Sequence, residues 1–307
     1  MAEINYSVYD RTLRAVDKAM EERKNSEHAR NYLGMSAIGE ECERKLFYSF
    51  RDAEKRFIQA SGIRAIEDGF AQEDVMAYRL RQVPGIKLIT EQDGAQIGFS
   101  SVDGHFRGHC DGMIYGILER PEKWHVWEHK SVNEAKFNKL SKLRDEHGEK
   151  SALEKWDEIY YAQAQIYMHS AKVDRHYLTV TSPGGRDYIS IRTALNEKAV
   201  DLILRKAHRI IYSTTIPAKI SEKSEYFKCK ICEYSGICHG EDEVRKSCGT
   251  CEAFAVIPEK FQCKRKNEEM ENQVPCKEWN LNPLFAKAIN IEQQSKESKV
   301  KTFAWSK

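Results

Sequence analysis

Hydrophobic and polar positions recur along the chain with two different periods, and these periods outline the expected elements. A period near 3.6 residues predicts helices over about 8–24, 42–61, 62–82, 151–171 and 196–213. Alternating or β-rich segments predict strands near 87–97, 104–111, 125–131, 176–181 and 187–192. The turn sequence Ser-Pro-Gly-Gly at 182–185 indicates a hairpin between the last two. This order predicts an α/β fold with a central mixed sheet flanked by helices.

Charged residues in two of these strands are the first candidates for chemistry. Asp111 stands where an alternating segment stops at Gly112, which suits a strand end. Glu128 and Lys130 are two residues apart in the next strand, so their side chains project from one face. If the two strands pair, that face carries two carboxylates, which suit Mg²⁺ or Mn²⁺, and an ammonium that can neutralise charge on a scissile phosphate. Taken alone, Glu-x-Lys on an exposed strand is more often an ordinary charge pair than a catalytic site.

The segment 151–171 adds two polar candidates. Gln163 and Tyr167 are four residues apart and therefore neighbours on one face of the expected helix. Their amide and phenol groups can bond a phosphate or orient the lysine. The alternative is a half-buried aromatic helix, and we expect Tyr160, Ile166 and Met168 to belong to the core.

The residues Asp111, Glu128-x-Lys130 and Gln163-x-x-x-Tyr167, in that order, resemble the motifs of the PD-(D/E)XK nuclease superfamily. The branch is the RecB-type exonuclease domain, to which viral recombination exonucleases and CRISPR-adaptation nucleases belong. Phage-encoded exonucleases have similar Gly-His-x-Asp-Gly and Tyr-Ala-Gln-x-Gln-Ile-Tyr blocks. The resemblance covers about residues 36–240. It implies a restriction-endonuclease-like core, metal binding by Asp111 and Glu128, activation of water by Lys130, and support of the lysine and DNA by Gln163 and Tyr167.

The family also has an acidic or histidine metal ligand on an upstream helix, following a glycine. The segment Gly-Phe-Ala-Gln-Glu-Asp at 69–74 is similar to that block, so the resemblance implies that Glu73 is a third metal ligand. Glu67, Asp68 and Asp74 compete with it for this role.

Nine cysteines give a second line of argument. The first 24 residues have the pattern of a polar amphipathic helix and not of a signal peptide. No stretch approaches the roughly 20 apolar residues of a membrane span. We therefore expect a cytoplasmic protein with no membrane contact, in the host cytoplasm if a phage encodes it. In that reducing compartment, clustered cysteines bind metal more often than they form disulfides.

Three of the cysteines, Cys229, Cys232 and Cys238, form a tight loop that lacks a fourth thiolate. The resemblance supplies it, because iron–sulfur members of the branch use one cysteine before the nuclease core, and Cys42 with the following Arg44 matches that position. Four thiolates suit a [4Fe–4S] cluster, and they suit tetrahedral Zn²⁺ equally well. An isolated buried thiol is the alternative for Cys42. Such a cluster would act structurally by closing a very long loop.

Four later cysteines, Cys248, Cys251, Cys263 and Cys276, are typical of a small zinc-binding appendage, in which His239 could replace one ligand. Cys110 remains, and we expect it to be a small buried strand residue. The resulting domains are a nuclease domain closed by four cysteines (1–240), a small lobe with the four later cysteines (241–285) and a flexible tail (286–307). Basic residues surround the later cysteines and could contact a DNA backbone, or form a solvated surface, namely Arg245, Lys246, Lys264, Arg265 and Lys266.

Composition agrees with an intracellular enzyme. The chain has 307 residues, of which 41 % are hydrophobic and 31 % charged. Its mean hydropathy of −0.66 argues against a membrane protein. The net charge is only +2, from 49 basic and 47 acidic residues, so any DNA-binding surface must be local.

The sequence therefore predicts a metal-dependent DNA exonuclease that hydrolyses phosphodiester bonds, in phage DNA recombination, repair or replication. DNA is the expected partner, and a phage single-strand annealing or recombination protein is a second one. Two alternatives stay open: an endonuclease of the CRISPR-adaptation type, and a non-catalytic DNA- or protein-binding module. The complete set of five motif residues favours catalysis, whereas the motifs do not separate exonuclease from endonuclease.

Overall fold

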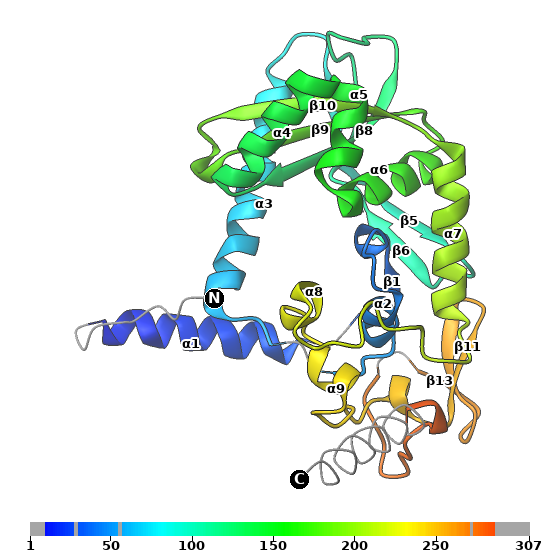
Figure 1. Ribbon diagram of the computed structural model, residues 1–307. Coiled ribbons are helices and arrows are strands. Elements are labelled where there is room, and N and C mark those ends of the chain that lie inside the picture. The colour runs from blue at the N-terminus through cyan, green and yellow to red at the C-terminus, as the bar shows by residue number, and fades with distance from the viewer. Residues whose placement is uncertain (1–9, 28–29, 55–56, 271–272, 286–307) are drawn as a thin grey trace, which may run out of the picture.

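The structure is a computed structural model that describes residues 10–27, 30–54, 57–270 and 273–285. Its upper part in Figure 1 is built on a mixed sheet with helices on both faces, as the sequence predicts. The strands follow the order β10 (Tyr188–Ala194), β9 (Arg175–Thr181), β8 (Trp124–Ser131), β7 (Gly112–Tyr115) and β2 (Lys87–Ile89). β8 and β9 are parallel and the other pairs are antiparallel. The predicted tail, 286–307, lies outside the described residues.

A second, three-stranded sheet corrects one expectation. It consists of β1 (Leu33–Gly34), β6 (Phe106–His109) and β5 (Gly98–Ser101). The predicted site depends on pairing of the expected strand 104–111 with the strand of Glu128. In the structure, β6 pairs with β1 and β5 instead. The chain leaves this sheet after His109 and enters the main sheet at Gly112, so β7 is the strand that pairs with β8. Asp111 therefore lies at the junction of the two sheets.

A turn breaks the expected strand 87–97. β2 ends at Ile89, and a short hairpin follows, made of β3 (Glu91–Gln92) and β4 (Ala95–Gln96). Asp93 and Gly94 between them have φ values of 54° and 77°. Asp-Gly is the dipeptide that favours such a left-handed hairpin turn, so the signal was present in the sequence and was missed.

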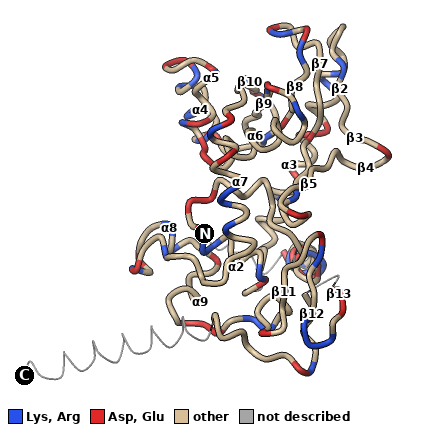
Figure 2. Tube along the Cα trace, turned by 90° about the vertical axis from the view of Figure 1, so that its right-hand side faces the viewer, with Lys and Arg blue, Asp and Glu red and all other residues tan. Residues whose placement is uncertain are grey.

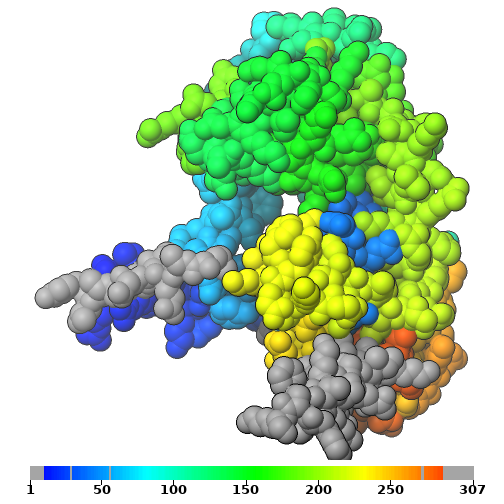
Figure 3. Space-filling view, viewed as in Figure 1, coloured from blue at the N-terminus to red at the C-terminus, as the bar shows by residue number. Residues whose placement is uncertain are grey.

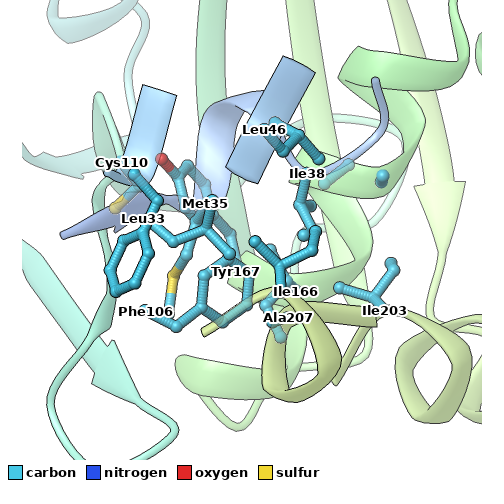
Figure 4. Packing of buried hydrophobic residues seen from close by; sticks show 14 of the residues in the cluster. Leu33, Met35, Ile38, Leu46, Phe106, Cys110, Ile166, Tyr167, Ile203 and Ala207 are labelled. Carbon is cyan, nitrogen blue, oxygen red and sulfur yellow. The ribbon is translucent and has the colours of Figure 1, made fainter. Parts of the chain in front are cut away.

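The helices cover the two faces of the main sheet. α3 (Ala60–Arg81) places Met76, Ala77 and Leu80 against Trp127 and its neighbours on one face. The opposite face carries the larger core. Its helices are α4 (Glu134–His147), α5 (Glu149–Trp156), α6 (Glu158–Ser170) and α7 (Glu197–Ile211). Figure 4 shows Met35, Phe106 and Tyr167 packed together in that core.

The expected helix 151–171 is two helices. Asp157 between them has φ −158°, which is not helical, and its carboxylate accepts hydrogen bonds from the N–H groups of Ile159 and Tyr160. This N-cap starts α6 afresh and fixes its direction. Between the expected strand 125–131 and the expected helix 151–171 lies α4, which was not predicted from the sequence and which Asn133 caps in the same way.

α1 (Arg11–Ser26) lies against the start of α3. Glu21 accepts a hydrogen bond of 2.8 Å from the N–H of Ala60, and Asn25 exchanges hydrogen bonds with the backbone of Ile58. The described residues contain no helix that is both long and apolar enough to cross a bilayer.

The lower part of the molecule joins early and late segments of the chain. It contains α2 (Glu43–Phe50), α8 (Phe227–Lys230), α9 (Ser235–His239) and a sheet of β11 (Phe254–Ile257), β12 (Lys260–Cys263) and β13 (Glu268–Met270). The expected helix 42–61 ends at Phe50, because Asp52 takes φ 46°. Arg51 is buried, donates a hydrogen bond of 2.6 Å to the carbonyl of Gly249 and packs on the Phe254 ring. The late segment therefore shares its core with α2.

Two glycines should respond to alanine with opposite signs. A Cβ at Gly39 would lie 2.4 Å from Cα of Ile159, so Gly39→Ala must push α6 away and should destabilise the protein by about 1–3 kcal/mol. Gly69 lies inside α3 with nothing within 4 Å of such a Cβ, so Gly69→Ala should stabilise it by about 0.5–1 kcal/mol. Urea unfolding of both variants measures the difference. Equal effects would show that the contact at Gly39 does not constrain α6.

Candidate active site

Asp111 and Glu128 lie side by side where β7 begins. Gly112 pairs with Trp127, which brings the preceding Asp111 next to Glu128. Oδ2 of Asp111 accepts a hydrogen bond of 2.7 Å from the N–H of His129. The N–H of Asp111 lies 3.4 Å from Oε1 of Glu128. The backbone of two adjacent strands thus holds both carboxylates in place.

Lys130 extends from β8 on the same face as Glu128. Its Nζ lies 2.8 Å from Oε2 of Glu128 and 3.7 Å from Oδ2 of Asp111. Burial lowers the pKa of Lys130, but the charges of Glu128 and Asp111 outweigh burial, so the net effect is a raised pKa. The side chain therefore stays an ammonium at neutral pH.

Gln163 and Tyr167 of α6 reach the same carboxylate. Nε2 of Gln163 donates a hydrogen bond of 2.9 Å to Oε2 of Glu128, and its side chain also bonds Tyr167. Burial raises the pKa of Tyr167, and the charge of Glu128 raises it further, so the phenol stays protonated. A Cβ at Gly108 would lie 2.7 Å from the Tyr167 ring, so only glycine leaves room for this side chain.

Glu73 is the residue of the acidic segment on which the charges of Asp111 and Lys130 act. Burial and then the charge of Asp111 raise the pKa of Glu73 to about 7, while Lys130 lowers it. Among the competing carboxylates, Glu67 pairs with Arg23 of α1 at 3.4 Å, and Asp68 accepts a hydrogen bond of 3.2 Å from Ser131. Glu73 is thus the acidic residue of α3 whose pKa responds to the charges of both Asp111 and Lys130.

The site carries more negative than positive charge. Burial raises the pKa of Glu128, and the charge of Asp111 adds to this effect. Among the described residues, no three His, Cys, Asp or Glu side chains already converge as the ligand set of a metal ion. The Lys130 ammonium lies between two of the carboxylates and balances part of their charge. Three carboxylates that repel one another are nevertheless the oxygen donors that Mg²⁺ or Mn²⁺ prefers.

Two residues beside the site were not recognised in the sequence as part of it. Tyr160, which we expected in the core, is only half-buried, and its ring centroid lies 5.7 Å from Nζ of Lys130. Lys136 of α4 lies over the same ring, with Nζ 4.4 Å from its centroid. No sequence motif marks Lys136, because the contact depends on the fold that brings α4 to α6.

The first cysteine set lines one cavity of about 400 Å³, which brings Cys42 together with Cys229, Cys232 and Cys238. Burial raises the pKa of all three downstream thiols, that of Cys232 to about 11. Nη1 of Arg44 lies 3.8 Å from Sγ of Cys238. The fold therefore places Cys42 and the three cysteines of 229–238, which are far apart in the sequence, around one cavity.

The second set, Cys248, Cys251, Cys263 and Cys276, lines a much smaller cavity of about 20 Å³. Burial, and then the charges of the other three, raise the pKa of Cys248 to about 11. His239 lines the first cavity and not this one.

The remaining sequence candidates are placed as follows. Cys110 is fully buried, as expected. Of the basic residues near the second set, Arg245 pairs with Asp52, Arg265 pairs with Glu252, and Lys246 lies over the Trp279 ring. Figure 2 shows basic and acidic residues interspersed along the chain, including this segment.

No protein-family model and no curated protein matches the chain. Several solved structures are similar to it. SSO0001 is 17 % identical with a TM-score of 0.39, over 74 % of this chain and 95 % of the other. The alkaline exonuclease LHK-Exo of Laribacter hongkongensis is 11 % identical, with a TM-score of 0.41, over 63 % and 90 %. A phage related exonuclease from Haemophilus somnus 129PT is 16 % identical, with a TM-score of 0.34, over 48 % and 70 %. The functional argument therefore rests on the side chains of the site.

A divalent cation should stabilise the protein through the three carboxylates. Mn²⁺ at 100 times its Kd should add about 2.7 kcal/mol to the free energy of unfolding, seen as a rise in Tm. Asp111→Asn keeps an acceptor for the N–H of His129 but removes a charge, so it should abolish the rise. Asp145→Asn, an exposed carboxylate of α4, is the control and should retain it. An equal rise in both variants would place the cation elsewhere.

Proposed function

We propose that this protein is a metal-dependent DNA exonuclease with a PD-(D/E)XK-type active site. One observation carries the proposal: the Lys130 ammonium and the Gln163 amide both bond Oε2 of Glu128, beside Asp111. A structural charge pair needs neither the second carboxylate nor the amide from a separate helix. The sequence resemblance supports the same roles for these residues.

Each side chain has a task in phosphodiester hydrolysis. Asp111, Glu128 and Glu73 would hold Mg²⁺ or Mn²⁺, which supplies an activated water and charge stabilisation. Lys130, which stays protonated, can bind the attacking water or stabilise charge on the phosphate. Gln163 fixes the orientation of Glu128, and Tyr167 bonds Gln163 from the buried side.

The proposed pathway is phage DNA recombination, repair or replication, with an annealing or recombination protein as partner. An endonuclease of the CRISPR-adaptation type is the second candidate. Incubation of end-labelled linear and closed circular DNA with Mg²⁺ or Mn²⁺ separates the two. Release of nucleotides from linear DNA with circular DNA intact supports the exonuclease, whereas cut circles support the endonuclease.

Lys130→Ala and Asp111→Ala should each lower the cleavage rate at saturating metal at least ~100-fold, because each removes transition-state stabilisation. Lys142→Ala and Asp145→Ala on the exposed face of α4 are matched controls and should keep the wild-type rate. Circular dichroism checks that all four variants are folded. A rate above about a tenth of wild type in either site variant would assign the chemistry to another site.

We propose two further cofactors on the cysteines. The first set, Cys42, Cys229, Cys232 and Cys238, would hold a [4Fe–4S] cluster, and the second, Cys248, Cys251, Cys263 and Cys276, one Zn²⁺. The lining of the cavities supports this division, because each set of four cysteines lines a cavity that the other set does not. The donor sets fit, since thiolates are the ligands of both groups.

Protein purified without oxygen should therefore be brown and contain both iron and zinc. Cys42→Ser should lose the visible absorbance and unfold at a lower temperature, while keeping its zinc. Cys276→Ser should lose zinc and keep its colour, which makes each variant the control of the other. Two zinc ions per chain with no iron would reject the iron–sulfur cluster and keep the ligand assignment.

A further inference from the structure

Two exposed apolar residues lie on the same face of α3 as the candidate ligand Glu73. Ile66, Phe70 and Glu73 follow one another at spacings of four and three residues, so they lie on one face of the helix. Asp68 of the same helix accepts a hydrogen bond of 3.2 Å from Ser131, the neighbour of Lys130. The charges of Asp111 and Lys130 act on Glu73. Phe70, one turn away, is 63 % exposed. A large aromatic ring therefore stands in solvent directly beside the site, although neither the core nor the chemistry uses it.

The other side of the site carries cations stacked on an aromatic ring. The Nζ atoms of Lys130 and Lys136 both lie over the Tyr160 ring, at 5.7 Å and 4.4 Å from its centroid. Lys136 also pairs with Asp157 at 2.7 Å and lies 5.1 Å from the Trp156 ring centroid. An ammonium has three donor hydrogens, so Lys136 can bond a phosphate and keep its pair with Asp157.

The carboxylates of Asp111 and Glu128 are recessed from the surface. Asp111 and Glu128 are only 8 % and 2 % exposed. Figure 3 shows the surface hollowed between the sheet-bearing upper part, α3 and the segment around α8, and Figure 1 shows α3 running along one side of that hollow. A scissile phosphate must therefore be drawn inward to reach the carboxylates.

We propose that the site takes an unpaired end of a DNA strand, with a base stacked on Phe70 and the phosphate next to the scissile one bound by Lys136. The inference rests on the proposed nuclease function and deepens it. Aromatic rings with flanking cations are the combination that holds single strands, because every unpaired base offers a π face. Interior base pairs of a duplex are already stacked on both faces, so the Phe70 ring has no access to them in DNA without ends.

Binding of a fluorescein-labelled oligonucleotide, measured by anisotropy with Ca²⁺, tests Phe70. Phe70→Ala should weaken single-strand binding roughly 5- to 100-fold, as the loss of one stacked base predicts, and change binding to a closed circular duplex less than about twofold. Phe70→Trp should restore single-strand affinity. The control is Tyr78→Ala, because Tyr78 is 66 % exposed on α3 but, five residues from Glu73, faces another side.

The salt dependence of the same binding tests Lys136. Lys136→Ala should reduce the slope of log K against log salt by about 0.7, the contribution of one phosphate of a single strand. Lys142→Ala, an exposed lysine of the same helix, should leave the slope unchanged.

The inference is overturned if Phe70→Ala binds single strands with the affinity of wild type. It is also overturned if the affinities for single-stranded and duplex DNA fall equally, or if Phe70→Ala and Tyr78→Ala have the same effect. An unchanged salt slope in Lys136→Ala would overturn the phosphate contact. Failure of the nuclease function itself is a separate result, because it appears as a wild-type protein that cleaves neither single- nor double-stranded DNA. Cleavage by wild type with an unaffected Phe70→Ala variant would reject only the stacking site.

Discussion

The burial of Glu128 is the constraint on which the rest of the site depends. A carboxylate that is 2 % exposed is costly to bury unless donors satisfy its oxygens. Lys130 and Gln163 both bond Oε2, and the N–H of Asp111 approaches Oε1. These donors come from the same strand, from a helix and from the neighbouring strand. Their convergence requires β7, β8 and α6 to keep their relative positions closely.

The topology of the sheets supplies that precision. β8 is a central strand, paired with β7 on one side and in parallel with β9 on the other. Asp111 has a fixed position because the chain passes there from the small sheet to the large one. At the next residue, Gly112, a Cβ would lie only 2.8 Å from the carbonyl oxygen of Ile89. A larger residue at 112 would separate β7 from β2. The junction is therefore both a packing constraint and the place of a candidate metal ligand.

The sequence was sufficient for features that depend on local pattern. The periods placed α3, α7, β8, β9 and β10 within a few residues, and the spacing of two put Glu128 and Lys130 on one face. The sequence was not sufficient where contacts between distant segments determine which strands pair. An alternating run ending at Asp111 does not reveal that β6 pairs with β1 and β5, because register and partner are set by the whole sheet.

The choice among the acidic residues of α3 shows the same limit. All four lie on one charged helix, and only the positions of Arg23, Ser131 and Asp111 distinguish Glu67, Asp68 and Glu73 from one another. Lys136 could not be found for the same reason, since Tyr160 and Trp156 meet it through the packing of α4 on α5 and α6. Asp93-Gly94 and Asp157 differ from these cases, because a turn and a cap are local signals that the sequence did contain.

α6 connects the first cysteine cavity with the candidate active site. Its first turn, at Glu158 and Ile159, lines that cavity together with Gly39 and Cys42. Further along, the same helix presents Gln163 to Glu128 at 2.9 Å. A rigid helix transmits a displacement of its start to its later residues, and a hydrogen bond of this length is lost with a shift of about 1 Å. A group bound by the four thiols would thus hold α6 at the distance from β8 that the carboxylate site requires, without taking part in its chemistry.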